Sequence, residues 1–101
     1  MERHEIISHH ARRRSQQRGI PLSLVENILD HHDRDAAVGN DCRVLRVSRN
    51  AARTFAATGG DRQTADRLPG IAVVWSDRTG RVVTIIHDGG NRAARRYRVG
   101  N

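Results

Sequence analysis

The sequence predicts an α+β domain in which an N-terminal pair of helices packs on a small antiparallel β-sheet. Three observations lead to this prediction. Residues and spacings typical of helices fill the first third of the chain, a β-type alternation follows near residue 45, and two apolar runs near the end are joined by a short turn. Strands that are consecutive in a chain often pair as neighbours, so one sheet with helices on one face is expected. The length of 101 residues indicates a single domain over 1–101.

The first expected helix covers His9–Gln17 and ends near Arg18. Its residues are polar and tolerated in helices, and Gly19 stands where a helix would end in the left-handed conformation. The short run Glu5–Ser8 before it is compatible with a first strand or with the lead-in to the helix. Its length does not decide between these two interpretations.

A second helix is expected in the segment IPLSLVENILDHH, which starts at Ile20. Pro21 suits the first turn of a helix because its φ is already close to the helical value. Apolar residues then recur at spacings of three and four, which places them on one helix face: Leu22, Val25, Ile28 and Leu29. The residues of Ala36–Asp41 are typical of a turn, and the alternation in Arg43–Ser48 predicts a strand after it.

The segment 50–70 is expected to connect this strand to a β-hairpin, with one or two short helices broken at its glycine pair, Gly59 and Gly60. The runs IAVVWSD and RVVTIIH, joined by the turn Arg78–Gly80, predict the hairpin. The tail RAARRYRV either adds an edge strand or forms a loose basic arm, and the sequence leaves both open.

All 18 basic residues are arginine, and against 11 acidic residues they give a formal net charge of +7. A GC-rich genome explains the choice of arginine over lysine, but it does not explain the excess of positive charge. The planar guanidinium group bonds phosphate with two parallel hydrogen bonds and stacks on bases. The composition therefore predicts a phosphate-bearing partner, with nucleic acid as the first candidate.

The composition also argues against several classes of protein. A single cysteine, Cys42, excludes an internal disulfide and favours a reducing compartment. No segment approaches the ~20 apolar residues of a membrane span, and the first residues lack the apolar stretch of a signal peptide. A cytoplasmic protein without membrane contact is expected. The phosphate-binding loop of P-loop nucleotide hydrolases requires a lysine, and this chain has none.

The run HHDRD, residues 31–35, contains residue types that bind metals. Neighbouring residues at the end of a helix point in different directions, and a histidine there already interacts favourably with the helix dipole. We therefore expect neither a metal nor another cofactor.

Residues His10, Arg14 and Arg18 follow one another at spacings of four, so a helix places them on one face. Cleavage of a phosphodiester requires proton transfer and cations that hold the phosphate. His87 ends the last predicted strand, where functional side chains often stand. We predict that these four residues form one catalytic pocket, with one histidine as base and the other as acid. A solvated basic face that binds without catalysis remains the alternative.

Further basic residues flank this set at both ends of the chain and are predicted to bind nucleic acid. The aromatic residue among them offers a ring on which a base could stack. The predicted binding residues are Arg12, Arg13, Arg92, Arg95, Arg96, Tyr97 and Arg98.

The pattern His-Ala-x-x-Arg-x-x-x-Arg-Gly-Ile at residues 10–20, together with the later run VVTIIH, resembles a family of small bacterial proteins of unknown function. That family is similar to the RelE/ParE toxin superfamily, in which two helices precede an antiparallel sheet and catalytic members cleave RNA without a metal. The family's retained polar positions fall on His10, Arg14, Arg18 and His87, with Arg98 or its neighbours as a further position.

This resemblance implies a toxin-like, metal-independent endoribonuclease that acts on RNA phosphodiesters, with the ribosome and an acidic antitoxin protein as expected partners. The chain departs from the family pattern in its longer middle, 50–70, and in the spacer Asp88–Asn91. The alternative is a non-catalytic protein that binds nucleic acid or a protein partner, including a degenerate toxin fold, because one fold hosts many functions.

Overall fold

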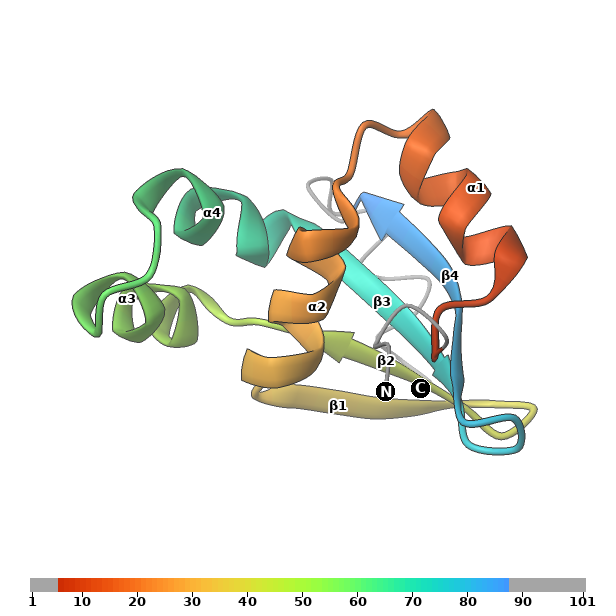
Figure 1. Ribbon diagram of the computed structural model, residues 1–101. Coiled ribbons are helices and arrows are strands. Elements are labelled where there is room, and N and C mark those ends of the chain that lie inside the picture. The colour runs from red at the N-terminus through yellow and green to blue at the C-terminus, as the bar shows by residue number, and fades with distance from the viewer. Residues whose placement is uncertain (1–5, 88–101) are drawn as a thin grey trace.

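The computed structural model describes residues 6–87, which form an α+β domain with an antiparallel sheet (Figure 1). The predicted fold class is confirmed, and the N-terminal helical pair packs on the sheet as expected. The elements in chain order are α1 (His9–Gln17), α2 (Leu22–His31), β1 (Arg34–Gly39), β2 (Cys42–Arg46), α3 (Arg49–Ala57), α4 (Arg62–Arg67), the 3₁₀ helix η2 (Leu68–Gly70), β3 (Ile71–Ser76) and β4 (Arg81–His87).

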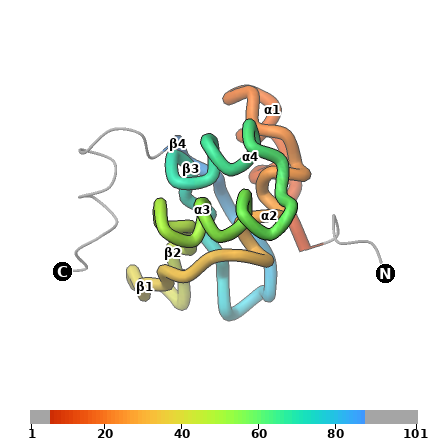
Figure 2. The backbone as a smooth tube through the Cα atoms, turned by 90° about the vertical axis from the view of Figure 1, so that its left-hand side faces the viewer, coloured from red at the N-terminus to blue at the C-terminus, as the bar shows by residue number. Residues whose placement is uncertain are grey.

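The sheet has the order β1-β2-β3-β4, so each strand pairs with the next one in the chain, and all pairs are antiparallel. The predicted hairpin is confirmed as β3 and β4, with one irregularity in register at Val74 and Trp75. Because β1 and β4 are the two edges, elements beside them lie on opposite sides of the domain. Figure 2 shows this separation for α1 and β1.

α1 begins at its cap, Ser8, whose hydroxyl accepts a hydrogen bond from the Ala11 amide at 3.1 Å. Before it, Ile7 makes a single parallel bridge to Val82 of β4, so the run before α1 leads into the helix. The helix ends as predicted, since Gly19 adopts a φ of +65°. Only the small residues Ala11 and Ser15 of α1 are buried, which lets the helix lie close to β4.

The main core lies between the helices and one face of the sheet. α2 contributes Leu24, Val25 and Ile28, while Leu22 and Leu29 are half-buried at its margin. The sheet side of this core consists of the residues Leu45, Ile71, Val73, Val82 and Ile85, with Val47 just beyond the end of β2. A smaller apolar cluster of Val44, Ala72 and Val74 occupies the other face. Both faces of the central strands are therefore buried.

The prediction of a turn over Ala36–Asp41 is wrong for most of that segment. β1 extends to Gly39, and the turn itself is confined to Asn40 and Asp41, whose φ values are +54° and +60°. Two successive positive φ values characterise the tight hairpin turn that favours asparagine and aspartate. β1 has exposed charged residues and small alanines instead of an apolar alternation, so pairing with β2 stabilises it as a strand.

The segment 50–70 forms two short helices, α3 and α4, in agreement with the expectation for it. The chain reverses at Gly59, which has a φ of +104°. A side chain at Gly60 would collide with the ring of Phe55, so the second glycine permits close packing of the turn on α3. Figure 1 shows both helices beyond one end of the sheet.

Asp33 connects the start of β1 to the start of α3. Its carboxylate accepts hydrogen bonds from the Ser48 hydroxyl at 2.5 Å and the Ser48 amide at 2.8 Å. These two hydrogen bonds hold the pKa of the Asp33 carboxyl below its ordinary value, and the one from the hydroxyl has the larger effect. Ser48 in turn caps α3 by accepting a hydrogen bond from the Ala51 amide at 3.1 Å.

We predict that Asp33→Asn lowers stability at pH 7 and that its difference from the wild type shrinks in acid. A carboxyl whose pKa is lower in the folded state stabilises the fold above its unfolded pKa, and this contribution is lost as the pH falls through the folded pKa. Urea unfolding midpoints between pH 7 and pH 2.5 measure the effect. Asp41→Asn is the control, since within residues 6–87 the Asp41 carboxylate makes no hydrogen bond. A constant difference at all pH values would contradict the prediction.

Candidate nucleic-acid interface

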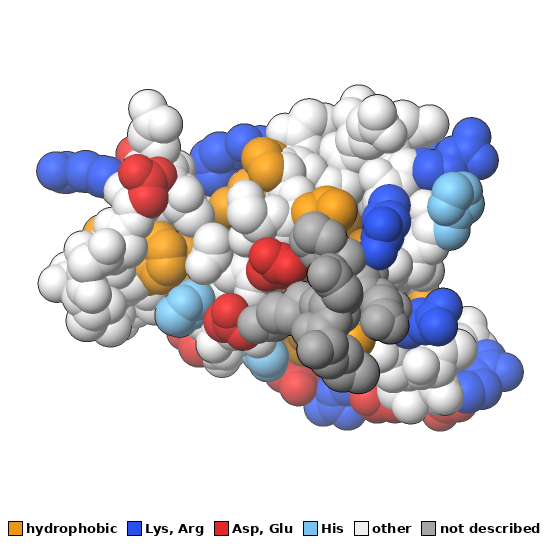
Figure 3. Space-filling view, viewed as in Figure 1, with side chains coloured by type: hydrophobic (Ala, Val, Ile, Leu, Met, Phe, Trp, Pro, Cys, Tyr) orange, Lys and Arg blue, Asp and Glu red, His pale blue; other side chains and the backbone are white. Residues whose placement is uncertain are grey.

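α1 is a basic helix with the sequence HHARRRSQQ, and it contains no acidic residue. His9, His10, Arg12 and Arg13 are exposed, and Arg14 is half-buried. Because the buried face consists of two small residues, the rest of the helix circumference faces solvent. Figure 3 shows basic and histidine side chains at the end of the molecule where α1 lies.

The C-terminal end of α1 is tied to the end of β4 by two hydrogen bonds. The Arg18 side chain donates from Nη1 to the carbonyl oxygen of Ile85 at 2.5 Å. The Nε2 atom of His87 lies 3.0 Å from the carbonyl oxygen of Arg18. The structure thus brings together two predicted site residues that are 69 positions apart in the sequence, Arg18 and His87.

The contact with a carbonyl oxygen defines which nitrogen of His87 carries the proton. A carbonyl only accepts, so Nε2 must donate, and in the neutral ring Nδ1 then has the free electron pair. The His87 side chain is exposed. An exposed nitrogen with a free electron pair on a ring of fixed orientation is able to accept a proton from a bound ligand.

His10 lies in a separate pair with Arg14, whose Nε is 3.5 Å from Nε2 of His10. Eight residues separate His10 from Arg18, which corresponds to about 12 Å along a helix axis. The predicted set therefore forms two neighbouring pairs, His10 with Arg14 and Arg18 with His87. His10 is at the N-terminal end of α1, and His87 contacts Arg18 just beyond its C-terminal end.

The remaining predicted binding residues fall into two groups. Arg13 is exposed, and Nε of Arg12 donates to the carbonyl oxygen of Ile7 at 3.4 Å. The others lie outside the residues that the structure describes: Arg92, Arg95, Arg96, Tyr97 and Arg98.

The side chains of the HHDRD run have structural contacts. His31 packs edge-on against Phe55, with ring centroids 5.0 Å apart, and Nδ1 of His32 lies 3.0 Å from the Leu29 carbonyl oxygen. Asp33 bonds Ser48, as described above, and the next carboxylate, of Asp35, pairs with Arg43 at 2.7 Å. Between residues 6 and 87, no group of three or more histidine, cysteine, aspartate or glutamate side chains is placed to hold a metal ion.

A second basic surface, which the sequence analysis did not predict, lies at the opposite edge of the sheet. It is an open groove of about 1790 Å³ between the β1–β2 edge and the helices α3 and α4. The arginines that line it are Arg34, Arg46, Arg49, Arg53 and Arg62. The helical spacing of Arg49 and Arg53 is visible in the sequence, but the others join them only through the tertiary structure.

Comparisons with protein-family models, with curated proteins and with solved structures give no significant match. In the part of the chain that the structure describes, no helix combines the length and the apolar character needed to cross a membrane.

We predict that the two histidines adopt opposite neutral tautomers. His87 would carry its proton on Nε2, because it donates to the Arg18 carbonyl, whereas His10 would carry it on Nδ1, because Nε2 accepts from Arg14. Long-range ¹H–¹⁵N NMR spectra, recorded at a pH where both rings are neutral, distinguish the two forms. The same tautomer at both positions would contradict these contacts.

Proposed function

We propose that this protein binds RNA through α1, with Arg13 and Arg14 as principal phosphate contacts. The observation that carries the proposal is a docked helix with a chain of basic residues and no acidic residue. Like charges four residues apart destabilise a helix, so this arrangement does not serve the stability of α1 itself. A bound polyanion removes the repulsion, and guanidinium groups bond phosphate oxygens well.

In this proposal, contacts with the RNA backbone contribute more to the affinity than contacts with the bases. Between residues 6 and 87 the aromatic rings are those of Phe55 and Trp75, and both are half-buried against the core, so neither offers a free ring for base stacking. RNA is favoured over DNA because His9 and His10 are exposed and imidazole exchanges hydrogen bonds with 2′-hydroxyl groups. Single-stranded RNA, whose backbone follows a convex surface easily, is the ligand that we propose.

Removal of charge from α1 tests this proposal. We predict that the double variant Arg13→Gln/Arg14→Gln binds a single-stranded RNA more weakly and that the slope of log K against log salt falls by about 1.4, or ~0.7 for each lost phosphate contact. Fluorescence anisotropy over a salt series measures both quantities. The matched control is Arg78→Gln/Arg81→Gln, which removes two exposed arginines near the β3–β4 turn. Equal slopes for both variants would refute a specific role of α1.

The contact between Arg18 and His87 favours a second candidate, a metal-independent endoribonuclease of the RelE/ParE type. In this reaction the 2′-hydroxyl of a nucleotide attacks the phosphorus of the adjacent 3′-phosphodiester, and Nδ1 of His87 takes the hydroxyl proton. The bond from phosphorus to the 5′-oxygen breaks, water protonates the leaving oxygen, and a 2′,3′-cyclic phosphate remains. Arg18 uses one of its five N–H donors on Ile85, so other donors are left for the phosphoryl oxygens.

We predict that His87→Gln abolishes cleavage of labelled RNA and leaves RNA binding unchanged, whereas His10→Gln retains cleavage. Glutamine keeps a donor for the Arg18 carbonyl but has no group that accepts a proton at neutral pH. Gel analysis of 5′-labelled RNA with and without EDTA measures the activity. Cleavage that survives His87→Gln would eliminate this candidate, and activity lost in EDTA but restored by one metal would overturn the metal-independent mechanism.

A further inference from the structure

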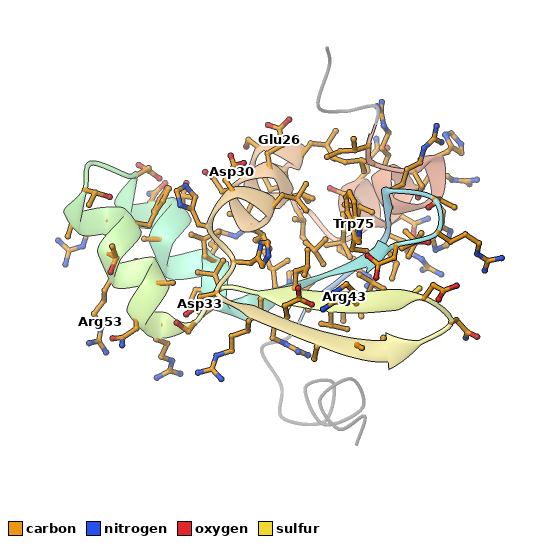
Figure 4. All side chains as sticks on the ribbon, turned by 90° about the horizontal axis from the view of Figure 1, so that it is seen from below. Glu26, Asp30, Asp33, Arg43, Arg53 and Trp75 are labelled. Atoms are coloured by element: carbon orange, nitrogen blue, oxygen red, sulfur yellow. The ribbon has the colours of Figure 1, made fainter. Side chains whose placement is uncertain are left out.

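The groove at the β1–β2 edge concentrates positive charge from two layers of the structure. Arg49 and Arg53 are four residues apart on α3, and Arg62 lies in the first turn of α4. The side chains of all three are exposed, and none of these side chains makes a hydrogen bond or ion pair with another residue between 6 and 87. Figure 4 shows Arg53 extending away from α3.

The sheet adds a cross-strand pair of arginines to the same groove. Arg34 of β1 is the direct register partner of Arg46 of β2, so both side chains lie on the same sheet face. The neighbouring residue Leu45 belongs to the core beneath the helices, which places the two arginines on the opposite face. Their register therefore brings two guanidinium side chains to one face of the sheet.

The groove is lined by fewer carboxylates than arginines. Three carboxylates line it, from Asp33, Asp35 and Asp66. Asp33 accepts two hydrogen bonds from Ser48, and Asp35 pairs with Arg43 at 2.7 Å. Of these three, Asp35 is paired with Arg43, which is not part of the lining, so the five lining arginines outnumber the two remaining carboxylates, Asp33 and Asp66.

The shape and lining of the groove favour a nucleic-acid strand over a protein. Small ligands occupy sites of about 300–1,000 Å³, whereas this groove has about 1790 Å³ and is open. Its apolar lining consists mainly of alanine and glycine, so it lacks a deep pocket for the large anchor side chain on which protein interfaces depend. A flexible backbone with a phosphate at every nucleotide matches a shallow surface with several guanidinium groups.

The groove and α1 are too far apart for a single phosphate group to contact both surfaces. α1 lies beside β4, whereas the groove is lined by residues of β1, β2, α3 and α4 at the other edge. Three strand spacings of about 4.8 Å place β1 roughly 14 Å from β4, and α1 and the groove lie at these two edges.

We infer that the arginine groove is a second phosphate-binding surface for single-stranded RNA, which allows one protein molecule to hold two RNA segments at once. This inference rests on the proposed function in one respect, namely that α1 binds the first of the two RNA segments. It adds an activity that one basic helix does not provide, because a single surface retains one strand, whereas two separated surfaces bridge two strands.

A bridging assay with the full-length protein tests the inference. One biotinylated single-stranded RNA is immobilised, and a second, fluorescent RNA without complementarity to the first is offered with the protein. The groove variant is Arg49→Gln/Arg53→Gln/Arg62→Gln, the α1 variant is Arg13→Gln/Arg14→Gln, and Arg78→Gln/Arg81→Gln is the control away from both surfaces. Anisotropy with one RNA is measured in parallel.

We expect the wild type and the control to capture the second RNA and the groove variant to lose this capture while it still binds one RNA. Retained binding of the first RNA shows that the variant is folded. Undiminished capture by the groove variant, or no capture by the wild type, would overturn the inference.

The two proposals fail in different ways in this assay. If α1 does not bind RNA, the α1 variant behaves like the control in anisotropy, while the groove variant alone loses affinity. If the groove does not bind RNA, the α1 variant alone loses affinity. Stronger displacement of bound RNA by polyglutamate than by polyuridine would assign the groove to an acidic protein partner and would also overturn the inference.

Discussion

The docking of α1 against β4 is the contact on which the candidate site depends. At its start, the Ser8 amide donates to the Val82 carbonyl at 2.9 Å, and at its end Arg18 donates to the Ile85 carbonyl. Between these points Ala11 and Ser15 are buried and small, so the helix lies directly on the strand. Attachment at both ends gives α1, which carries no acidic residue, a fixed orientation on the sheet.

The use of the acidic residues explains why so much positive charge faces solvent. Asp33 and Asp61 accept hydrogen bonds at the starts of α3 and α4, which lowers the pKa of both carboxyls, and Asp35 pairs with Arg43. Carboxylates that cap helices or bind neighbouring side chains contribute to the fold. Between residues 6 and 87, most of the other arginines lie on or next to α1 and in the groove, at the two edges of one sheet.

Local patterns predicted most of the fold. α1 and α2 follow from helical spacing and from Gly19, and the β3–β4 hairpin follows from two apolar runs around a short turn. β1 was missed because it contains one large apolar residue, Val38, among alanines and exposed charges, so its pairing with β2 is the decisive stabilising interaction. A strand of this kind forms only when it pairs with a neighbouring strand. The β-propensity of a few consecutive residues does not reveal that pairing.

The amino-acid sequence by itself determined the excess of arginine, the absence of acidic residues from α1 and the common face of His10, Arg14 and Arg18. These properties follow from composition and from the period of the α-helix, which are local. Only the tertiary structure decided that His87 meets Arg18 and stands apart from His10, and that Arg34 faces Arg46. Such contacts depend on the docking of a helix and on strand register, and both are set by packing between segments far apart in the chain.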